Sequence, residues 1–408
     1  MDGSGHTLLS VSDARARVLA LCAPLPREEA PVDSAVGRAL LETVVAARTV
    51  PPWDNSAMDG YAVRSVDAAA PGARLTVVAT IMAGQTPACR LGPGECARIM
   101  TGAPIPEGAD AVVMQEKATR AGDAVELLEA VRPRQHVRDL GEDARAGEPL
   151  LAAGTVLGVP EAGMLWGQGL TKVPVPRRPK VAVLSTGDEL CHFDQPEPGK
   201  IVDTNGPSLA LAAKRLGAVV TSLGIARDEA EDVLERLRPG LGFDAVITSA
   251  GVSVGERDVV KDALLALGVE MSFWRVAIKP GKPLAVGRKG RTVFFGLPGN
   301  PTSSLVSFEL FVRPALRRMM GHADVEPPRV PGRLDVDAPL SKPAGMVHYV
   351  RATAPLRDGA LRARPLPSQT SGALQSAALA THLIELPAEG TRFAAGDAVA
   401  LLPVSWAG

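Results

Sequence analysis

The sequence predicts a multidomain α/β plus β protein, with a central doubly wound and mostly parallel sheet domain. Three observations predict it. At 408 residues the chain exceeds what one hydrophobic core usually serves, so two to four domains are expected. From residue 180 to 320, short apolar runs alternate with helical patterns, which favours a parallel sheet covered on both faces. The flanking stretches show short runs between glycine and proline turns, which predict helical and β-rich N-terminal domains and a small β-barrel-like C-terminal domain.

Proline-rich segments mark the predicted domain boundaries. "VPVPRRPK" precedes the alternating region and "EPPRVPG" ends it. The four predicted domains are residues 1–50 with 139–178, which form a helical linking domain, 51–138, 179–326 and 327–408.

The N-terminal elements follow from caps and turns. Ser10 or Ser12 can cap a helix that runs to about residue 22, and a second helix is expected over 33–45. Residues 139–172 mix turns with one short helix after Pro160 and are expected to rejoin the N-terminal helices. Four β-like runs lie between these helical parts, at 75–84, 96–106, 109–116 and 124–131.

The alternating region and the tail supply the remaining elements. Strands are expected at 180–185, 218–226, 244–249, 283–287 and 292–297. Helices are expected at about 206–216, 229–238, 258–267 and 301–320. The tail, 329–408, shows alternating stretches without a convincing helix, so it predicts a small all-β unit.

Composition excludes several classes of protein. The chain carries 44 Lys and Arg against 45 Asp and Glu, so no global field recruits nucleic acid or a membrane surface, and any anion site must be local. The N-terminus shows no signal-peptide or membrane-span pattern, which makes the cytoplasm the expected location. The four cysteines and six histidines show no CxxC, zinc-ligand or HExxH spacing.

The turn "IKPGKP" raises an electrostatic question. Lys279 and Lys282 stand three residues apart, each followed by proline. At about 5 Å and an effective dielectric constant of about 20, two ammonium groups repel by roughly 3 kcal/mol. This cost predicts an anionic ligand.

Small, polar and acidic residues follow the predicted strands, where ligands of open α/β sheets bind. In "PGNPTSS", Asn300 suits a helix cap and Pro301 the first helical position, and Ser303 or Ser304 could add a hydroxyl for an oxyanion. A well-capped helix without a ligand also accounts for this pattern.

Glycines and carboxylates extend the same predicted site. In "AGVSVGERD", Gly251 and Gly255 let backbone amides approach a phosphate, although the stretch matches neither the Walker pattern nor GxGxxG. Glu189, Asp228 and Asp258 follow strands and could hold Mg²⁺. Each acid could equally cap a helix, and the aspartates of "DNSAMDGYAV" could simply form turns. Because the acids and two lysines are expected at one edge of the sheet, a ligand-binding site is favoured over separate helix caps.

Seven stretches together resemble one family, the molybdopterin molybdenumtransferases or MoeA family, which is related to the E domain of gephyrin. They occur in family order across most of the chain, and the combination is highly specific. The stretches are "DNSAMDGYAVR", "RIMTGAPIPEGADAVVMQE", "STGDEL", "DTNG", "GVSVGERD", "IKPGKP" and "GLPGNPTSS".

The resemblance implies a fold and a reaction. It implies an elongated, L-shaped homodimer with four domains per subunit, whose α/β domain is related to molybdopterin adenylyltransferases. The implied reaction inserts molybdate into adenylylated molybdopterin and cleaves the phosphoanhydride, releasing AMP and molybdenum cofactor, with Mg²⁺ as the expected ion. The implied cleft lies between the α/β domain of one subunit and the "DNSAMDGYA" domain of the other, and an adenylyltransferase is a possible partner.

The resemblance also implies roles for individual residues. The implied catalytic residues are Asp59, which acts across the dimer interface, Glu189, Lys279 and Lys282. Glu189, Asp228 and Asp258 are implied on the metal side. The implied substrate-binding residues are Thr101, Gly251, Ser253, Gly255, Pro298, Asn300, Pro301, Ser303, Arg351 and Ser371, the last arginine and serine completing a molybdate pocket.

Two stretches of the sequence depart from the family pattern. Ala250 stands where the family commonly has glycine, and "CHFDQPEPGKIVDTNG" is idiosyncratic; neither removes a charged group of the motifs.

A nucleotide-dependent kinase or dehydrogenase is disfavoured because Walker and GxGxxG patterns are lacking. A molybdopterin adenylyltransferase and a non-enzymatic, gephyrin-like scaffold remain alternatives, although a scaffold has no need for the acids and lysines together.

Overall fold

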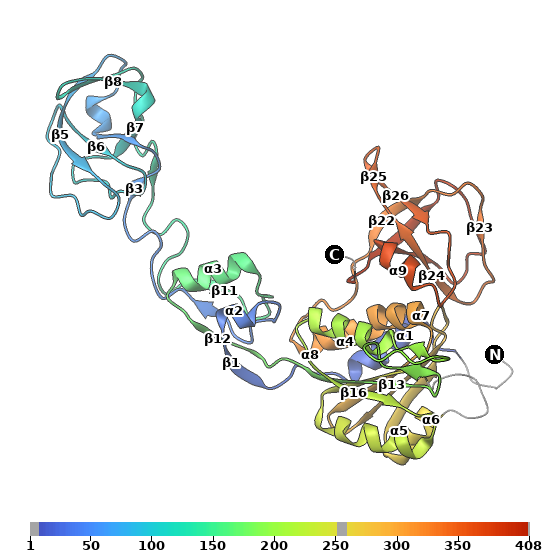
Figure 1. Ribbon diagram of the computed structural model, residues 1–408. Coiled ribbons are helices and arrows are strands. Elements are labelled where there is room, and N and C mark those ends of the chain that lie inside the picture. Colours follow the sequence, from blue (N-terminus) through green and yellow to red (C-terminus); the bar gives the residue numbers. More distant parts are fainter. Residues whose placement is uncertain (1–7, 251–258, 407–408) are drawn as a thin grey trace. The chain divides into compact units, whose positions relative to one another are not determined.

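The computed structural model describes residues 8–250 and 259–406 (Figure 1). The chain divides into two compact units. The larger unit comprises Met1–Leu41, Gly154–Val159 and Lys172–Gly408, and the smaller unit comprises Glu42–Ala153 and Pro160–Thr171. The four domain boundaries expected from the sequence stay predictions.

The smaller unit is built on a six-stranded sheet in the order β7-β4-β6-β5-β9-β8. Its strands are β4 Gly60–Val63, β5 Arg74–Ile81, β6 Glu95–Ile99, β7 Ala111–Met114, β8 Ala118–Ala121 and β9 Ala124–Leu127. Neighbours on one strand face opposite sides, since Val112 and Val113 belong to different apolar clusters. The predicted β-rich region is confirmed, whereas β4 and β8 were not predicted.

Short elements make up the rest of the smaller unit. β2 Val44–Val45 pairs with β11 Pro149–Leu151, and β3 Asn55–Ser56 pairs with β10 Val137–Arg138. The helix expected after Pro160 is α3, Val159–Gly167.

The first helix of the larger unit begins where its cap predicts. α1 spans Val11–Ala20, and the Ser10 hydroxyl accepts a hydrogen bond from the Asp13 amide at 3.0 Å. Val11, Ala14 and Val18 recur at helical spacing and are buried in the main core of this unit.

The helix expected over 33–45 is wrong beyond Ala35. α2 spans only Val32–Ala35, because Val36 has extended backbone and Gly37 follows with φ of +85°. The chain then places the buried Arg38 guanidinium against the Pro176 carbonyl at 3.1 Å and against Glu28. This contact lies beside the pair formed by β1, Arg27–Pro31, and β12, Lys172–Pro176.

The centre of the larger unit is a six-stranded sheet in the order β16-β13-β17-β21-β20-β18. Its first four strands run parallel, β20 runs antiparallel to β21, and β18 runs antiparallel to β20. The strands are β13 Lys180–Thr186, β16 Val219–Ala226, β17 Ala245–Ser249, β18 Glu270–Arg275, β20 Pro283–Lys289 and β21 Thr292–Leu297. The predicted mostly parallel sheet is confirmed, with β18 as an edge strand that was not predicted.

Helices cover both faces of this sheet (Figure 1). α5 Ala230–Leu237 and α6 Val259–Ala266 pack on one face. α1, α4 Asn205–Arg215, and the succession of α7 Pro301–Ser307, a π-helical turn Phe308–Val312 and α8 Arg313–Met319 pack on the other. No helix in the described ranges is long and apolar enough to span a bilayer.

A buried ion pair ties the segment after β12 to this sheet. The Arg177 guanidinium donates to both Asp244 oxygens, at 2.6 and 2.7 Å, and the Lys180 amide donates to the same carboxylate at 2.8 Å. Burial alone would raise the pKa of Asp244, but the hydrogen bonds from Arg177 and Lys180 outweigh it and hold the pKa below its ordinary value.

The C-terminal strands close into a five-stranded barrel, because β24 pairs with both β27 and β26 in the order β24-β27-β29-β22-β26. The strands are β22 Val330–Leu334, β24 Val347–Thr353, β26 Ala360–Pro365, β27 His382–Leu386 and β29 Ala398–Pro403. β19 Ile278–Lys279 and β25 Leu356–Arg357 extend it, and β23 Leu340–Ser341 pairs with β28 Arg392–Phe393. The predicted barrel-like domain is confirmed, and the short α9 Leu374–Leu379 was not predicted.

The end of the chain returns to the π-helical turn. Glu309 in that turn is fully buried, and its carboxylate accepts hydrogen bonds from Arg313 at 2.9 Å and from the Ser405 amide at 3.3 Å and the Ser405 hydroxyl. The Trp406 indole also donates to the Ala377 carbonyl at 3.0 Å. The Ser405 contacts join the end of the chain to the long helical stretch of the α/β part, and the Trp406 contact joins it to α9.

Candidate active site

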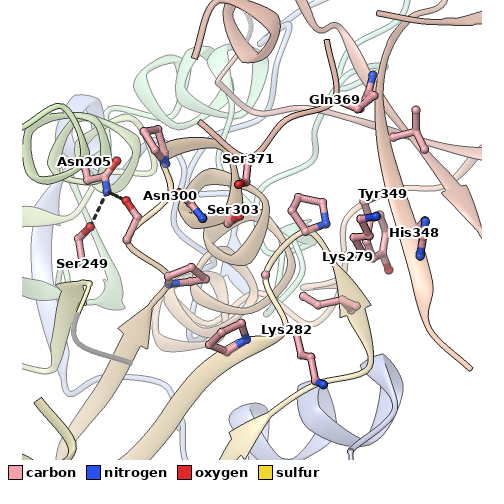
Figure 2. A pocket seen from close by; sticks show the side chains of 18 of the residues that line it. Asn205, Ser249, Lys279, Lys282, Asn300, Ser303, His348, Tyr349, Gln369 and Ser371 are labelled. Atoms are coloured by element: carbon pink, nitrogen blue, oxygen red, sulfur yellow. Dashed lines mark hydrogen bonds between the residues drawn. The ribbon is translucent and has the colours of Figure 1, made fainter. Parts of the chain in front are cut away.

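A cavity of about 1200 Å³ lies in the larger unit between the carboxyl edge of the parallel sheet and the barrel (Figure 2). The loops after β13, β17 and β21 line one side of it, together with the start of α4. The turn between β19 and β20 and the barrel segments around β24 and residue 371 line the other. The sheet edge that the sequence singled out is therefore a wall of a real cavity.

The cavity brings together eight of the predicted site residues from four separate segments. They are Glu189, Lys279, Lys282, Pro298, Asn300, Pro301, Ser303 and Ser371. Gly251, Ser253, Gly255 and Asp258, which were also predicted, lie outside the described residues.

The lysine turn is held at the seam between sheet and barrel. β19 pairs in parallel with β24, which makes Lys279 the neighbour of His348. Gly281 allows the turn, since its φ is +104° and a Cβ there would lie 2.7 Å from the Ser307 hydroxyl. Lys279 is exposed to the cavity and makes no ion pair with a described residue, so its charge is available to a ligand.

The start of α7 is bound by the barrel rather than by its own cap. Asn300 occupies the N-cap position with extended backbone, but its side chain makes no capping hydrogen bond. The expected N-cap position of Asn300, with Pro301 at the first helical position, is therefore confirmed, whereas capping by its side chain is not seen. The Thr302 amide and hydroxyl instead donate to the Ser371 carbonyl, at 3.0 and 2.7 Å, and the Asn300 side chain stays at the cavity (Figure 2).

Arg351 lies behind the cavity wall. It is 1% exposed, its Nε donates to the Ser376 hydroxyl, and its Nη2 donates to the carbonyls of Ser368 and Thr370 at 3.1 and 2.9 Å. Burial lowers its pKa, and its Nη1 has no partner among the described residues. Arg351 thus holds the loop that presents Ser371, and its predicted contact with substrate stays a prediction.

The predicted metal-side carboxylates come from neighbouring loops. Glu189 borders the cavity, whereas the exposed Asp228 does not. The Asp228 amide donates to the Asp188 carboxylate at 3.2 Å, which joins the loops after β16 and β13. Within residues 8–250 and 259–406, no three His, Cys, Asp or Glu side chains form a group that could hold a metal ion.

Asp59 and Thr101 lie together in the smaller unit. The Thr101 amide donates to the Asp59 carboxylate at 2.7 Å, and the Thr101 hydroxyl donates to the same oxygen at 2.8 Å. These two hydrogen bonds lower the pKa of Asp59, which keeps this exposed carboxylate ionised.

Asn205 borders the cavity and has no role in the sequence-based site. Its amide nitrogen donates to the Ser249 hydroxyl at 2.7 Å and to the Gly299 carbonyl at 2.6 Å (Figure 2). It therefore ties the loop after β17 to the loop after β21. The "DTNG" stretch contained this signal, but its spacing does not reveal the two loops that it joins.

Two basic residues of the barrel were also missed. Lys342 is buried and donates to the carbonyls of Pro343, Met346 and Ala388, and burial lowers its pKa. Burial, with repulsion from Lys279 and Lys342, lowers the pKa of His348 to about 4. Lys342 thus adds a second source of positive potential to the cavity.

Comparison with known proteins decides the family. Profiles described as the MoeA N-terminal region (domain I and II), the probable molybdopterin binding domain and the MoeA C-terminal region (domain IV) match residues 9–169, 182–318 and 333–404. A "Molybdopterin molybdenumtransferase 2" of Mycobacterium tuberculosis is 38% identical over 93% of this chain and 95% of its own length. The chain belongs to the MoeA family.

Other MoeA relatives agree over nearly the whole chain. A "Molybdopterin molybdenumtransferase" of Haemophilus influenzae is 36% identical over 97% of this chain and 98% of its own length. The crystal structure of a "molybdopterin biosynthesis moeA protein" from Pyrococcus horikoshii has a TM-score of 0.82 and 29% identity, covering 97% of this chain and all of the other. The MoeA resemblance predicted from the motifs is confirmed.

Proposed function

We infer that this MoeA family member is a molybdopterin molybdenumtransferase. It inserts molybdate into adenylylated molybdopterin and cleaves the phosphoanhydride, which releases AMP and molybdenum cofactor. The observation that carries this inference is the placement of Lys279 and Lys282 at a cavity beside the carboxyl edge of the sheet. Molybdate and the diphosphate are both anions, and their charge offsets the repulsion between the two lysines.

The residues of the cavity have distinct roles in this proposal. Lys279 and Lys282 bind anionic oxygens and stabilise the negative charge that develops on the leaving AMP. Asn300, Ser303 and Ser371 offer neutral hydrogen-bonding groups at the same cavity. Pro298 and Pro301 restrict the loop that carries Asn300, so less conformational freedom is lost on binding.

Mg²⁺ is the proposed ion. Glu189 and Asp228, together with Asp258, would hold it, and carboxylate oxygens from adjacent loops are ligands that Mg²⁺ accepts beside water and substrate phosphate. The Asp188 contact with the Asp228 amide supports this fit, since it brings the two loops together. When bound, Mg²⁺ would offset charge on the diphosphate.

The proposed assembly is a homodimer. Asp59, oriented by the hydrogen bonds from Thr101, would enter the site of the partner subunit. A molybdopterin adenylyltransferase is proposed as the protein that delivers the adenylylated substrate. A molybdopterin adenylyltransferase activity for this chain itself is less favoured, because the barrel contributes Ser371 to the cavity.

AMP release tests the proposed function. Purified protein is mixed with adenylylated molybdopterin, molybdate and Mg²⁺, and AMP is measured with time. We expect release to require molybdate, and Lys279→Ala to slow it by about 100-fold, as for the loss of one charge-stabilising donor. Lys214→Ala is the matched control, because Lys214 is exposed on α4 outside the cavity. If Lys279→Ala keeps both the rate and the molybdate requirement, the assignment of this lysine is wrong.

A further inference from the structure

The barrel wall of the cavity carries a histidine that the proposed chemistry does not yet use. His348 lies on β24 and borders the cavity (Figure 2). Its neighbour on β19 is Lys279, and adjacent strands lie about 4.8 Å apart. The imidazole therefore stands beside one of the two proposed anion-binding lysines.

The imidazole has unused hydrogen-bonding capacity. His348 is 9% exposed, and its buried Nε2 has no hydrogen-bond partner in the described ranges. An unmet buried polar group is unfavourable, so a partner for it stabilises the site. A ligand oxygen in the cavity could supply the missing partner.

Positive charge surrounds the ring. Lys279 faces it from β19 and Lys342 from the segment after β23, and together with burial they bring its pKa to about 4. Lys282 borders the same cavity. Two acids of the barrel have other partners, since Glu385 on β27 binds Arg329 and Tyr349, and Glu389 acts on Lys342. His348 is therefore neutral at physiological pH before an anion binds.

We propose that His348 is a further contact of the oxyanion that Lys279 and Lys282 bind, and that it takes up a proton from solvent as this anion enters. The proposal rests on the proposed function, which makes molybdate the oxyanion. Molybdate carries two negative charges, so its arrival offsets the repulsion from Lys279 and Lys342 that keeps the imidazole neutral. The site gains a further positive group only when the anion is present.

Proton uptake can be observed directly. Carbon-13-labelled protein contains six histidines, and the loss of one Cε1 signal in His348→Gln identifies His348. At pH 6, we expect molybdate alone to move this signal from the position of neutral imidazole to that of imidazolium. Calorimetry in two buffers of different ionisation enthalpy should show proton uptake on molybdate binding by the wild type, and none by His348→Gln.

The variants give an affinity readout and a control. We expect His348→Gln to weaken molybdate binding by about five- to tenfold at pH 6, and by less at pH 8. His382→Gln is the matched control, because His382 is a half-buried histidine of the same barrel that pairs with Ala352 away from the cavity. It should bind molybdate as the wild type does. If His348→Gln does not fold, His348→Asn replaces it.

Two results would overturn the proposal. Wild type that binds molybdate and releases AMP, without any change of the His348 signal or any proton uptake, would refute the role of His348 and leave the proposed function intact. Wild type that neither binds molybdate nor releases AMP would refute both.

Discussion

Ala250 is held with φ of +76° at the point where β17 leaves the sheet for the cavity. This left-handed conformation costs an L-residue about 1–2 kcal/mol, and glycine adopts it freely. The Ala250 methyl group also lies where a Cβ at Gly299 would approach it to 3.0 Å. Strain at this residue is thus located on the rim of the proposed site.

Replacing Ala250 with glycine should relieve that strain. After the entropic penalty of glycine in the unfolded chain, we expect Ala250→Gly to raise the free energy of unfolding by about 0.5–1 kcal/mol. Urea unfolding measures the change. Ala245→Gly, in the extended part of the same strand, is the control and should destabilise the protein. A loss of stability in Ala250→Gly would contradict the argument.

Site residues that stand in recognisable motifs could be predicted, whereas a cavity-lining residue outside the motifs could not. The motifs "IKPGKP" and "GLPGNPTSS" contain four residues that border the cavity, namely Lys279, Lys282, Asn300 and Ser303. His348 lies in an ordinary alternating strand, and its chemistry depends on Lys279, 69 positions earlier, becoming its neighbour through β19. Such a contact is created by strand pairing and leaves no local pattern.

At the scale of elements, hydrogen bonds connect the barrel loop that carries Ser371 to the start of α7. We call this connection the joint. Thr302 is fully buried, and both its amide and its hydroxyl donate hydrogen bonds to the Ser371 carbonyl. The joint places a barrel residue beside the sheet edge. It also explains why the amide of Thr302 is not offered to a ligand.

Breaking one bond of this joint should loosen the site. Thr302→Val keeps the side-chain shape and removes the hydroxyl, which is worth about 1 kcal/mol. We expect molybdate affinity to fall by about fivefold, since 1.4 kcal/mol corresponds to a factor of ten. Calorimetry measures the affinity, and Thr302→Ser, which keeps the hydroxyl, serves as the control. Equal affinities for the two variants would exclude this role.

The pair of Arg177 and Asp244 fixes the segment before β13. Its contribution to stability is present above pH 3.8, the ordinary pKa, and is lost as the pH falls below it, because the folded pKa of Asp244 is depressed. Arg177→Met leaves a buried carboxylate unpaired, so we expect a loss of about 3 kcal/mol at pH 7.

The pH dependence of unfolding checks this account. The difference between wild type and Arg177→Met should shrink between pH 7 and pH 3.5, because protonation removes the uncompensated charge in the variant. Lys180→Met, which removes an exposed positive charge at the start of β13, is the control. A difference that stays constant over this range would argue for lost packing instead.

Elements were predictable where one physical signal dominated. Buried parallel strands such as β13 and β21 read as continuous apolar runs, and the Ser10 cap placed α1 correctly. β18 was missed because it is an edge strand with irregular register against β20, so its burial does not alternate cleanly. The helix over 33–45 failed because Gly37 and the buried Arg38 contacts override helical propensity.

At the scale of the whole molecule, the proposed dimer predicts complementation between two inactive variants. Asp59→Asn and Lys279→Ala each damage a different part of the proposed site. Mixed subunits should form heterodimers with one intact site, and random pairing then restores about a quarter of the wild-type rate of AMP release. Sedimentation should show a dimer for every protein.

The controls separate assembly from catalysis. Each variant assayed alone should remain inactive, and a mixture of Lys279→Ala with Lys282→Ala should gain nothing, because both changes affect the same side of the site. Recovery in that second mixture, or none in the first, would argue against a shared site.

The link between Glu309 and Ser405 has a consequence for synthesis on the ribosome. The carboxylate sits in the middle of a helical stretch that is translated almost a hundred codons before its hydroxyl partner. Until that serine emerges, Arg313 is the side chain left to neutralise this acid, and the barrel lacks its last strand, β29. Nascent chains stalled before residue 398 should therefore engage chaperones and resist native compaction, however well their sheet has formed.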